Sequence, residues 1–159
     1  MAACTKENGE IMLRLKAPGQ ERLLPTPCAG GNLRRGGEAN VAVSLVNYGT
    51  EASFFTALPK GAIGDACIRE RRRFNVDTSR ILRAPGRMGI YYLEGGANQL
   101  PSRVIYDREN TAIAQAAPGS IDWENTLADV DWFHIMGITP AISETAMLLS
   151  LEARYNGIL

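Results

Sequence analysis

The sequence predicts an α/β fold with a β-hairpin that stands off the main sheet. Residues 40–48 show the spacing of a helix and are followed by a short apolar run at 52–58. A helix that leads into a buried strand is typical of an α/β layer. Two β-rich runs at 88–93 and 103–106 are joined by a loop of Gly, Asn and Pro residues, which predicts the hairpin.

The start of the chain shows little strand character. Ile11 to Leu15 is the first segment able to pair in a sheet, because the polar residues Lys6 to Glu10 make a poor buried strand. A loop rich in Pro and Gly follows from Pro18 to Gly37, and part of it is expected to form an edge or lid strand. The first strand is therefore expected to be damaged or truncated.

The α/β layer begins with the predicted helix from Asn40 to Tyr48, after which Gly49 stands where a left-handed cap is expected. Ala52 to Leu58 is aromatic and apolar and is stopped by Pro59, so it predicts a buried strand. Asp65 to Phe74 combines a narrow apolar stripe with a run of arginines, the pattern of an exposed helix. A solvated basic face is favoured there over an anion site.

Three further elements are expected after the hairpin. Trp123 to Ala128 predicts a short helix, and Trp132 to Met136 predicts a strongly buried strand. Ser143 to Tyr155 predicts a helix with Ser143 as its N-cap and Gly157 as its end.

The composition is that of an ordinary globular chain. Its 159 residues are 45% hydrophobic and 21% charged, enough for one buried core. Lys plus Arg and Asp plus Glu both number 17, so no net charge draws the chain to nucleic acid or to an acidic membrane. The three cysteines show no metal-ligand spacing, and no apolar run has the length of a signal-peptide core or a transmembrane helix. We expect a soluble, cytoplasmic protein without a nucleic-acid or membrane partner.

The first candidate site is a glycine motif, Gly36 to Asn40, that leads directly into a helix. Glycines let the backbone approach a ligand closely, and a helix N-terminus offers free N–H donors to oxygen atoms. An ordinary turn with an N-cap fits the same residues, so both interpretations stay open.

The predicted hairpin carries the second candidate site. Tyr91 lies on its first strand, while Tyr106 and Arg108 lie two residues apart at the second, so the three side chains are able to project from one sheet face. A guanidinium beside phenol hydroxyls suits a ligand with a carboxylate and hydroxyl groups. From the local pattern alone, the favoured alternative has tyrosines that pack a sheet edge and Arg108 paired with Asp107 or Glu109.

Other residues give weaker signals. Gly137 to Pro140 follows a predicted strand, where strand ends of an open α/β sheet line ligand crevices, but a plain strand-to-helix turn also fits. His134, the only histidine, lies within an apolar run, which favours a packed core histidine over a catalytic base. Gly64 and Asp65 lack the glycine-rich loop with Lys and Ser or Thr that a phosphate cradle needs.

Six segments, taken in order, resemble the 2-keto-3-deoxygluconate kinases (2-dehydro-3-deoxygluconokinases) of the ribokinase-like, PfkB carbohydrate kinase family. They span nearly the whole chain and are Gly9–Leu15, Gly36–Ala42, Phe74–Ser79, Gly89–Glu94, Val104–Arg108 and Trp132–Ala141. The glycine-asparagine motif is shared by the wider family. The Gly-Ile-Tyr, Tyr-x-Arg and Gly-Ile-Thr-Pro-Ala motifs are more particular to the keto-deoxy sugar acid kinases.

The resemblance implies part of a ribokinase-like three-layer sandwich that carries a β-sheet lid. Residues 1–159 would form the N-terminal, sugar-binding part of one kinase domain, with lid strands around 11–37 and 88–108. The sugar acid, 2-keto-3-deoxygluconate or a relative of it, would be held between lid and sandwich.

The resemblance also implies which residues touch the substrate. The backbone at Gly36 and the side chains of Tyr91, Tyr106 and Arg108 match the family's substrate contacts, and Asn40 is a weaker addition from the same glycine motif. Since the lid often forms the dimer contact in this family, the resemblance also implies a homo-oligomer through the lid strands.

The family transfers the γ-phosphoryl group of ATP to a terminal sugar hydroxyl, with Mg²⁺ and a Gly-Ala-Gly-Asp motif whose Asp is the base. That motif and the nucleotide pocket are expected beyond Leu159. We therefore expect no catalytic, cofactor-binding or metal-binding residue in this chain, and no activity from the chain alone.

Two alternatives stay open. Another PfkB-type kinase, for a neutral sugar or a nucleoside, is disfavoured by the Tyr-x-Arg motif, because a neutral sugar needs no carboxylate receptor. A non-catalytic, sugar-acid-binding fragment fits the recognition half alone.

Overall fold

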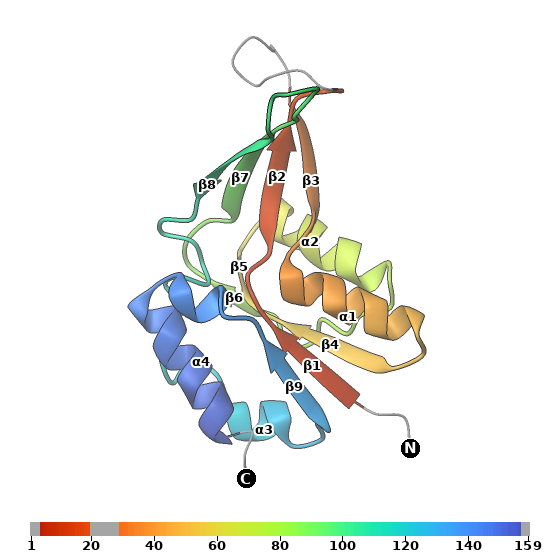
Figure 1. Ribbon diagram of the computed structural model, residues 1–159. Coiled ribbons are helices and arrows are strands. Elements are labelled where there is room, and N and C mark those ends of the chain that lie inside the picture. Colours follow the sequence, from red (N-terminus) through yellow and green to blue (C-terminus); the bar gives the residue numbers. More distant parts are fainter. Residues whose placement is uncertain (1–3, 20–28, 157–159) are drawn as a thin grey trace.

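The computed structural model describes residues 4–19 and 29–156, whose arrangement is shown in Figure 1. In chain order the elements are β1 (Cys4–Asn8), β2 (Met12–Lys16), β3 (Gly30–Arg35), α1 (Gly37–Asn47), β4 (Glu51–Phe55), β5 (Ala57–Pro59), α2 (Ala62–Arg72), β6 (Leu82–Ala84), β7 (Gly89–Glu94), β8 (Arg103–Asp107), α3 (Trp123–Leu127), β9 (Trp132–Ile135), the 3-10 helix η1 (Thr139–Ala141) and α4 (Glu144–Asn156). Within these two ranges, no helix has the length and apolar character needed to cross a membrane.

The middle layer of the body is a parallel sheet of three strands in the order β4-β1-β9. Successive residues of a strand point to opposite faces of its sheet. Phe54 of β4 accordingly packs with α1 and α2 on one face, whereas Phe55 lies 5.2 Å from Trp123 of α3, between ring centroids, on the other. Helices thus cover both faces, which confirms the predicted three-layer α/β sandwich.

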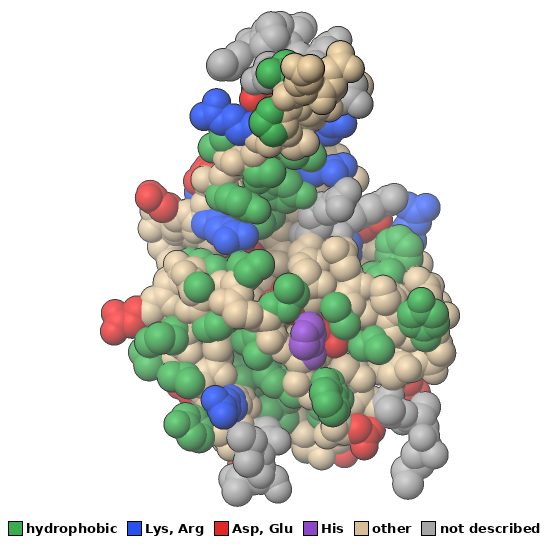
Figure 2. Space-filling model, in the orientation of Figure 1, with side chains coloured by type: hydrophobic (Ala, Val, Ile, Leu, Met, Phe, Trp, Pro, Cys, Tyr) green, Lys and Arg blue, Asp and Glu red, His purple; other side chains and the backbone are tan. Residues whose placement is uncertain are grey.

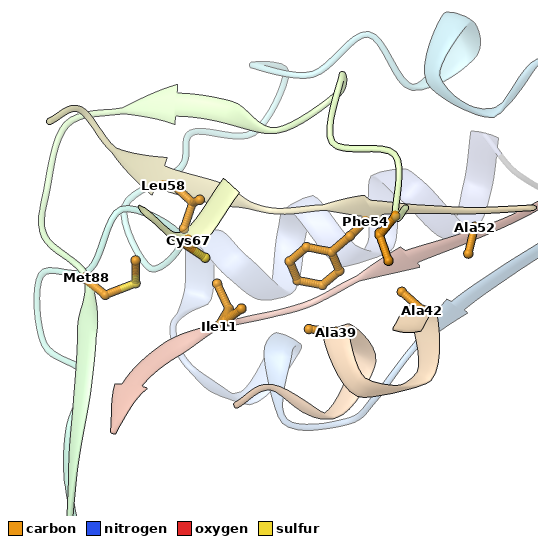
Figure 3. Packing of buried hydrophobic residues seen from close by; sticks show 9 residues of the cluster. Ile11, Ala39, Ala42, Ala52, Phe54, Leu58, Cys67 and Met88 are labelled. Carbon is orange, nitrogen blue, oxygen red and sulfur yellow. The ribbon is translucent and has the colours of Figure 1, made fainter. Parts of the chain in front are cut away.

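The core between the sheet and helices α1 and α2 is drawn in Figure 3. Phe54 is fully buried there, beside the small side chains of Ala39 and Ala42 on α1. Burial of such an aromatic side chain stabilises the fold by about 1.5–3 kcal/mol. Because α1 is packed closely against the sheet, its first residue, Gly37, has a fixed position relative to the strands.

A second sheet of four strands, in the order β3-β2-β7-β8, stands away from one end of the body and forms the lid (Figure 1). The passage from Gly9 to Ile11 joins β1 in the body to β2 in the lid. β7 and β8 pair antiparallel, which confirms the hairpin, and β3 confirms that part of the 18–37 segment forms an edge strand of the lid. Residues 20–28, with Cys28, lie outside the described residues.

The first strand differs from the expectation. β1 is a complete strand at the centre of the parallel sheet, although Lys6, Glu7 and Asn8 are polar and buried. Its backbone pairs with strands on both sides, Lys6 Nζ donates to the backbone oxygen of Thr126, and Glu7 contacts His134. Backbone pairing along both edges stabilises β1 as a strand, although its polar side chains do not favour a buried strand. The expectation of a damaged first strand is therefore wrong.

Three other expectations need correction. The apolar run at 52–58 divides at Thr56, where the chain passes from β4 into β5, which pairs with β6. β9 is an edge strand whose first residue, Trp132, is 67% exposed, so the strand is not strongly buried. In α2, Arg71 is buried and donates to the backbone oxygen of Leu33 at 3.3 Å, so the basic helix face is only partly solvated.

The predicted helices are present with shifted ends. α1 begins at Gly37, before the expected start, and Gly49 after it has a φ of +84°, as its cap role requires. Ser143 is confirmed as the N-cap of α4, because its Oγ accepts a hydrogen bond from the Ala146 N–H at 3.1 Å. Gly157, the expected end of α4, lies outside the described residues.

Candidate functional site

A cavity of about 220 Å³ lies where the lid meets the body. It is lined by Glu10, Met12, Gly36, Gly37, Glu38, Tyr91, Val104, Tyr106, Arg108, Ile138 and Thr139. Its volume is below the roughly 300–1,000 Å³ of sites for drug-sized ligands, so it suits a small molecule. It also lies beyond the carboxyl ends of the parallel strands, where open α/β sheets bind ligands.

The candidate cavity is smaller than other hollows of the described residues, and the two with the largest volumes suit a small polar ligand less well. One, of about 590 Å³, lies at the opposite end of the sheet beside Lys6 and Asp77. The other, of about 470 Å³, lies between β9 and α4 and is lined mainly by apolar side chains such as Trp132 and Leu151. Hydrophobic side chains also gather on the surface over α4 (Figure 2). The cavity under the lid is therefore the candidate site.

The lid supplies an aromatic and cationic wall. Tyr91 on β7 lies opposite Tyr106 on β8, and their ring centroids are 6.0 Å apart. The guanidinium carbon of Arg108 lies 4.4 Å from the centroid of the Tyr106 ring. A cation within about 6 Å of a tyrosine ring is attracted to its face, so Tyr106 helps to hold Arg108 at the cavity.

The body supplies a wall of close-packed backbone at the start of α1. A Cβ atom on Gly36 would lie 2.8 Å from the backbone oxygen of Glu10 and 3.3 Å from the Cβ of Ala39. A Cβ atom on Gly37 would collide with Met136. Because the obstacle at Gly36 is backbone, glycine is required there for close approach, beside the end of a helix whose N–H groups lack partners within the helix.

Glu10 and Arg108 join the two walls. Arg108 Nε lies 3.0 Å from Glu10 Oε2, and the Glu10 side chain is only 4% exposed. Burial raises the pKa of Glu10 to about 7, while the charge of Arg108 opposes the rise and that of Glu38 adds to it. A buried carboxyl group thus titrates near neutral pH at the cavity wall.

Glu38 is a second buried carboxylate of the site, and it is well supplied with donors. Its Oε1 accepts hydrogen bonds from Thr139 Oγ1 at 2.9 Å and from the Met136 N–H at 3.3 Å. Its carboxylate also packs where a Cβ atom on Gly9 would stand. The Gly-Ile-Thr-Pro segment is thereby tied to the start of α1.

The structure brings together four of the five residues nominated from the sequence, and the fifth lies apart. Gly36, Tyr91, Tyr106 and Arg108 line the cavity, whereas Asn40 lines a separate hollow between α1 and α2. The sequence left open an ion pair of Arg108 with Asp107, and the structure shows that this pair is not formed. Asp107 contacts Arg87, and Arg108 turns toward Glu10.

Sequence reasoning missed Glu10 and Glu38 as site residues. Both stand beside glycines, in the segments Gly9–Glu10 and Gly36–Gly37–Glu38. The sequence feature that could have identified them is an acidic residue next to a glycine at the boundary of a helix or strand. The pattern does not reveal that the two side chains converge, because that depends on how β1 and α1 pack.

His134 is not the packed core histidine that its apolar run predicts. Its side chain is 33% exposed, it is visible at the surface in Figure 2, and its Nδ1 contacts Oε2 of the fully buried Glu7. Burial raises the pKa of Glu7, and the contact with His134 opposes that rise. The pair lies outside the candidate cavity, so His134 has no part in the site.

The chemistry of the lid wall is set by Arg108, Tyr91 and Tyr106, which all line the cavity. A guanidinium and two phenols are suited to a carboxylate and to hydroxyl or keto oxygens. Among residues 4–19 and 29–156, no three His, Cys, Asp or Glu side chains are placed to hold a metal ion. Gly64, next to Asp65, lies inside α2 and not in a phosphate-binding loop.

Residues 9–156 match the family model described as pfkB family carbohydrate kinase. The chain is 35% identical over 137 residues to the 2-dehydro-3-deoxygalactonokinase of Haloferax volcanii, a stretch that covers 86% of this chain and 42% of that protein.

Solved structures of carbohydrate kinases are also similar to this chain. The 2-dehydro-3-deoxygluconokinase of Thermotoga maritima is 42% identical, with a TM-score of 0.90 over 95% of this chain and 46% of that one. A protein of Enterococcus faecalis described as a 2-keto-3-deoxygluconate kinase is 25% identical, with a TM-score of 0.93 over 99% and 46%. A ribokinase II of E. coli, at 20% identity and a TM-score of 0.80 over 99% and 50%, shares the fold and was solved with ATP and Mg²⁺. The chain thus spans half the length of these relatives or less.

Proposed function

Because this chain belongs to the pfkB family of carbohydrate kinases, we propose that it forms the sugar-acid-recognition part of a 2-keto-3-deoxygluconate kinase domain. The observation that carries this proposal is the convergence of Tyr91, Tyr106 and Arg108 with the Gly36 backbone on one small cavity. The relatives at 35% and 42% identity are both named as kinases of keto-deoxy sugar acids.

Arg108 is the group that distinguishes a sugar acid from a neutral sugar. A guanidinium at a cavity wall binds a carboxylate through charge-assisted hydrogen bonds, worth about 1.5–3 kcal/mol each. Tyr91 and Tyr106 add phenol hydroxyls on the same face of the lid, which suit the keto and hydroxyl oxygens of the ligand. The lid would hold the acid end of the sugar against the glycine backbone of α1.

In the whole protein the proposed reaction is transfer of a phosphoryl group from ATP, with Mg²⁺, to the terminal hydroxyl of the sugar acid. Among the described residues, no three His, Cys, Asp or Glu side chains are grouped to hold a metal ion. We assign no catalytic step to the described residues. The proposed task of this chain is to bind and orient the acceptor sugar, which is a major part of catalysis by positioning.

A non-catalytic sugar-acid-binding module is the second candidate function. The same cavity supports it, because recognition needs only the residues that line it. Measurement of sugar-acid binding and of ATP-dependent phosphorylation in the same preparation distinguishes the two functions.

The test is calorimetric titration of the 159-residue chain with 2-keto-3-deoxygluconate, with fructose as the neutral control. Saturable binding of the acid alone supports the proposal, and absence of binding contradicts it. Arg108→Ala is expected to abolish binding. Arg87→Ala is the matched control, since Arg87 pairs with Asp107 and does not line the cavity.

Removal of Arg108 leaves Glu10 buried without its counter-charge, which destabilises a fold by several kcal/mol in comparable cases. The double variant Arg108→Ala with Glu10→Gln avoids this effect. If the double variant is folded and still binds the acid as well as the wild type does, Arg108 is not the carboxylate receptor.

We also propose that two copies of the chain associate through their lids. Two apolar side chains at the hairpin that do not line the cavity, Leu100 and Ile105, are 57% and 43% exposed. Ile105→Glu is expected to shift the mass measured by light scattering from dimer to monomer. Ile63→Glu is the control, because Ile63 is 49% exposed on α2 in the body. A wild-type monomer contradicts the proposal.

The proposed location of this chain is the cytoplasm. Cys4 and Cys67 are free thiols among the described residues, which suits a reducing compartment. Fractionation of cells that express the tagged chain tests this.

A further inference from the structure

The candidate cavity is lined by more acidic than basic side chains. Among the described residues that line it, Glu10 and Glu38 are acidic and Arg108 is basic. A sugar acid would bring a third carboxylate to a single guanidinium. Like charges that share a poorly solvated site are costly, and one of them usually becomes protonated.

Glu38 already has hydrogen-bond donors at its carboxylate. Its Oε1 accepts hydrogen bonds from the Thr139 hydroxyl and from the Met136 N–H, at 2.9 and 3.3 Å. Donors that point at a carboxylate oxygen suit its ionised form. The bond from Thr139 ties η1 to the start of α1.

Glu10 is placed differently. Its side chain is 4% exposed, and within the described part of the chain neither of its carboxylate oxygens accepts a hydrogen bond. Arg108 Nε is 3.0 Å from Oε2, but its N–H is directed to Sδ of Met12, 3.4 Å away. Burial raises the pKa of Glu10 to about 7, with Arg108 opposing and Glu38 adding to the rise.

We propose that Glu10 takes up a proton from solvent when a ligand carboxylate binds to Arg108, and then donates its new O–H to the ligand. This inference rests on the proposed function, because it requires a sugar acid in this cavity. Arg108 exchanges one carboxylate partner for another, and the formal charge of the cavity is the same before and after binding. Glu10 is thereby a binding residue for the acid end of the ligand.

The side chains that line the cavity with Glu10 decide which other groups near it carry a charge or can titrate. Arg108 and Glu38 carry the charges, and Tyr91 and Tyr106 add phenols. The remaining neighbours cannot titrate: Thr139 Oγ1 accepts the Glu10 backbone N–H at 3.4 Å, Met12 contributes a thioether, and a Cβ atom on Gly89 would lie 2.7 Å from Glu10 Oε1. Glu10 is the group among them whose charge a bound carboxylate would change.

The pH dependence of binding follows from the reciprocity of linked equilibria. Above about pH 7 free Glu10 is mostly ionised, so binding must include proton uptake and the affinity for the acid falls by up to about tenfold per pH unit. Below about pH 6 Glu10 is already protonated, so the affinity is nearly constant there.

The experiment is calorimetric titration of the 159-residue chain with 2-keto-3-deoxygluconate at pH 8, in phosphate and in Tris buffer. The difference in observed enthalpy, divided by the difference in buffer ionisation enthalpy, gives the number of protons taken up. We expect about 0.5–1 proton for the wild type. Glu10→Gln is expected to take up none and to bind at pH 8 at least as tightly as the wild type.

Glu7→Gln is the matched control, because Glu7 is also a buried carboxyl group with a raised pKa but contacts His134 outside the cavity. It is expected to keep the wild-type proton uptake. Binding of the acid without proton uptake overturns this inference and leaves the proposed function standing. Absence of binding overturns both. The inference is also overturned if a folded Glu10→Gln variant does not bind the acid, or if that variant still takes up a proton on binding. The pH dependence of wild-type affinity tests the inference without any variant.

Discussion

Arg108 in the lid and Glu10 in the body form an ion pair across the boundary between the two sheets, with Nε 3.0 Å from Oε2. Glu10 lies in the short passage that connects β1 to β2, and Arg108 follows directly after β8. The contact that joins lid and body therefore contains a carboxyl group whose pKa, raised by burial to about 7, lies in the neutral range. Both the stability and the ligand affinity of the chain are expected to depend on it.

The first prediction concerns stability and pH. Because burial raises the pKa of Glu10 from 4.5 to about 7, the folded state keeps a proton that the unfolded state loses in that window. The stabilising contribution is complete below pH 4.5 and is lost as the pH rises to about 7, on the order of 3 kcal/mol. The Glu10→Gln variant has no such titrating group and does not lose this contribution. The difference in free energy of unfolding, variant minus wild type, is therefore expected to rise by about 3 kcal/mol between pH 4.5 and about 7.

Urea unfolding of wild type and Glu10→Gln at several pH values between 4 and 8 measures this difference. Other titrating groups contribute equally to both proteins, so they cancel in the comparison. A difference that stays constant with pH contradicts the assignment of the raised pKa to Glu10.

The second prediction concerns the phenol hydroxyls. Tyr91→Phe removes a hydroxyl from the cavity face of β7 and keeps the ring that lies 6.0 Å from Tyr106. Loss of one hydrogen bond to the ligand is expected to weaken sugar-acid binding by about 3–10-fold, from about 0.5–1.5 kcal/mol. Tyr92→Phe is the control, because Tyr92 lies opposite Ile105 on the other face of the hairpin. Equal effects of the two substitutions would mean that Tyr91 does not touch the ligand.

The third prediction concerns close approach at the glycine motif. In Gly36→Ala the new Cβ would stand 2.8 Å from the Glu10 backbone oxygen, so either α1 or the β1–β2 passage must shift. We expect a stability loss of about 1–3 kcal/mol and weaker ligand binding, measured by denaturant unfolding and calorimetry. Gly137→Ala is the control, since a Cβ atom there meets nothing within 4 Å. A neutral Gly36→Ala contradicts the role of this wall.

The sequence predicted the elements whose side chains follow a clear period. α1, α2, α4 and the β7–β8 hairpin were all expected, because their apolar residues repeat at helical or strand spacing. The clustering of Tyr91, Tyr106 and Arg108 was also expected, since alternation along a strand places residues two apart on one face. These patterns involve residues that are close together in the chain, so they can be recognised in a single sequence.

The sequence could not predict features that depend on distant packing. β1 is polar, and only its two neighbouring strands show that it is buried. Arg71 belongs to a run of arginines whose pattern predicts a solvated helix face. Its side chain nevertheless donates a hydrogen bond to the backbone oxygen of Leu33, which lies 38 positions earlier in the sequence. Glu10 and Glu38 converge only because β1, α1 and η1 meet at one point.

The last prediction concerns the polar central strand. Asn8 is fully buried at the end of β1, and within the described residues neither its amide oxygen nor its amide nitrogen has a hydrogen-bond partner. A buried amide without partners costs about 1–3 kcal/mol relative to a paired or solvated one. Asn8→Leu, which keeps the branched shape without polar atoms, is expected to stabilise the chain by that amount. In a domain of this size the midpoint of thermal unfolding would rise by about 2–4 °C per kcal/mol.

The control for this substitution is Asn47→Leu at the exposed end of α1, which adds the same apolar group without relief of a buried amide. It is expected to change stability by less than about 0.5 kcal/mol. If Asn8→Leu destabilises the chain, the amide of Asn8 has a partner, such as a buried water, and the polar strand is satisfied in solution. A stabilised variant would instead show that β1 is held by its backbone pairing with β4 and β9, against the preference of its own side chains.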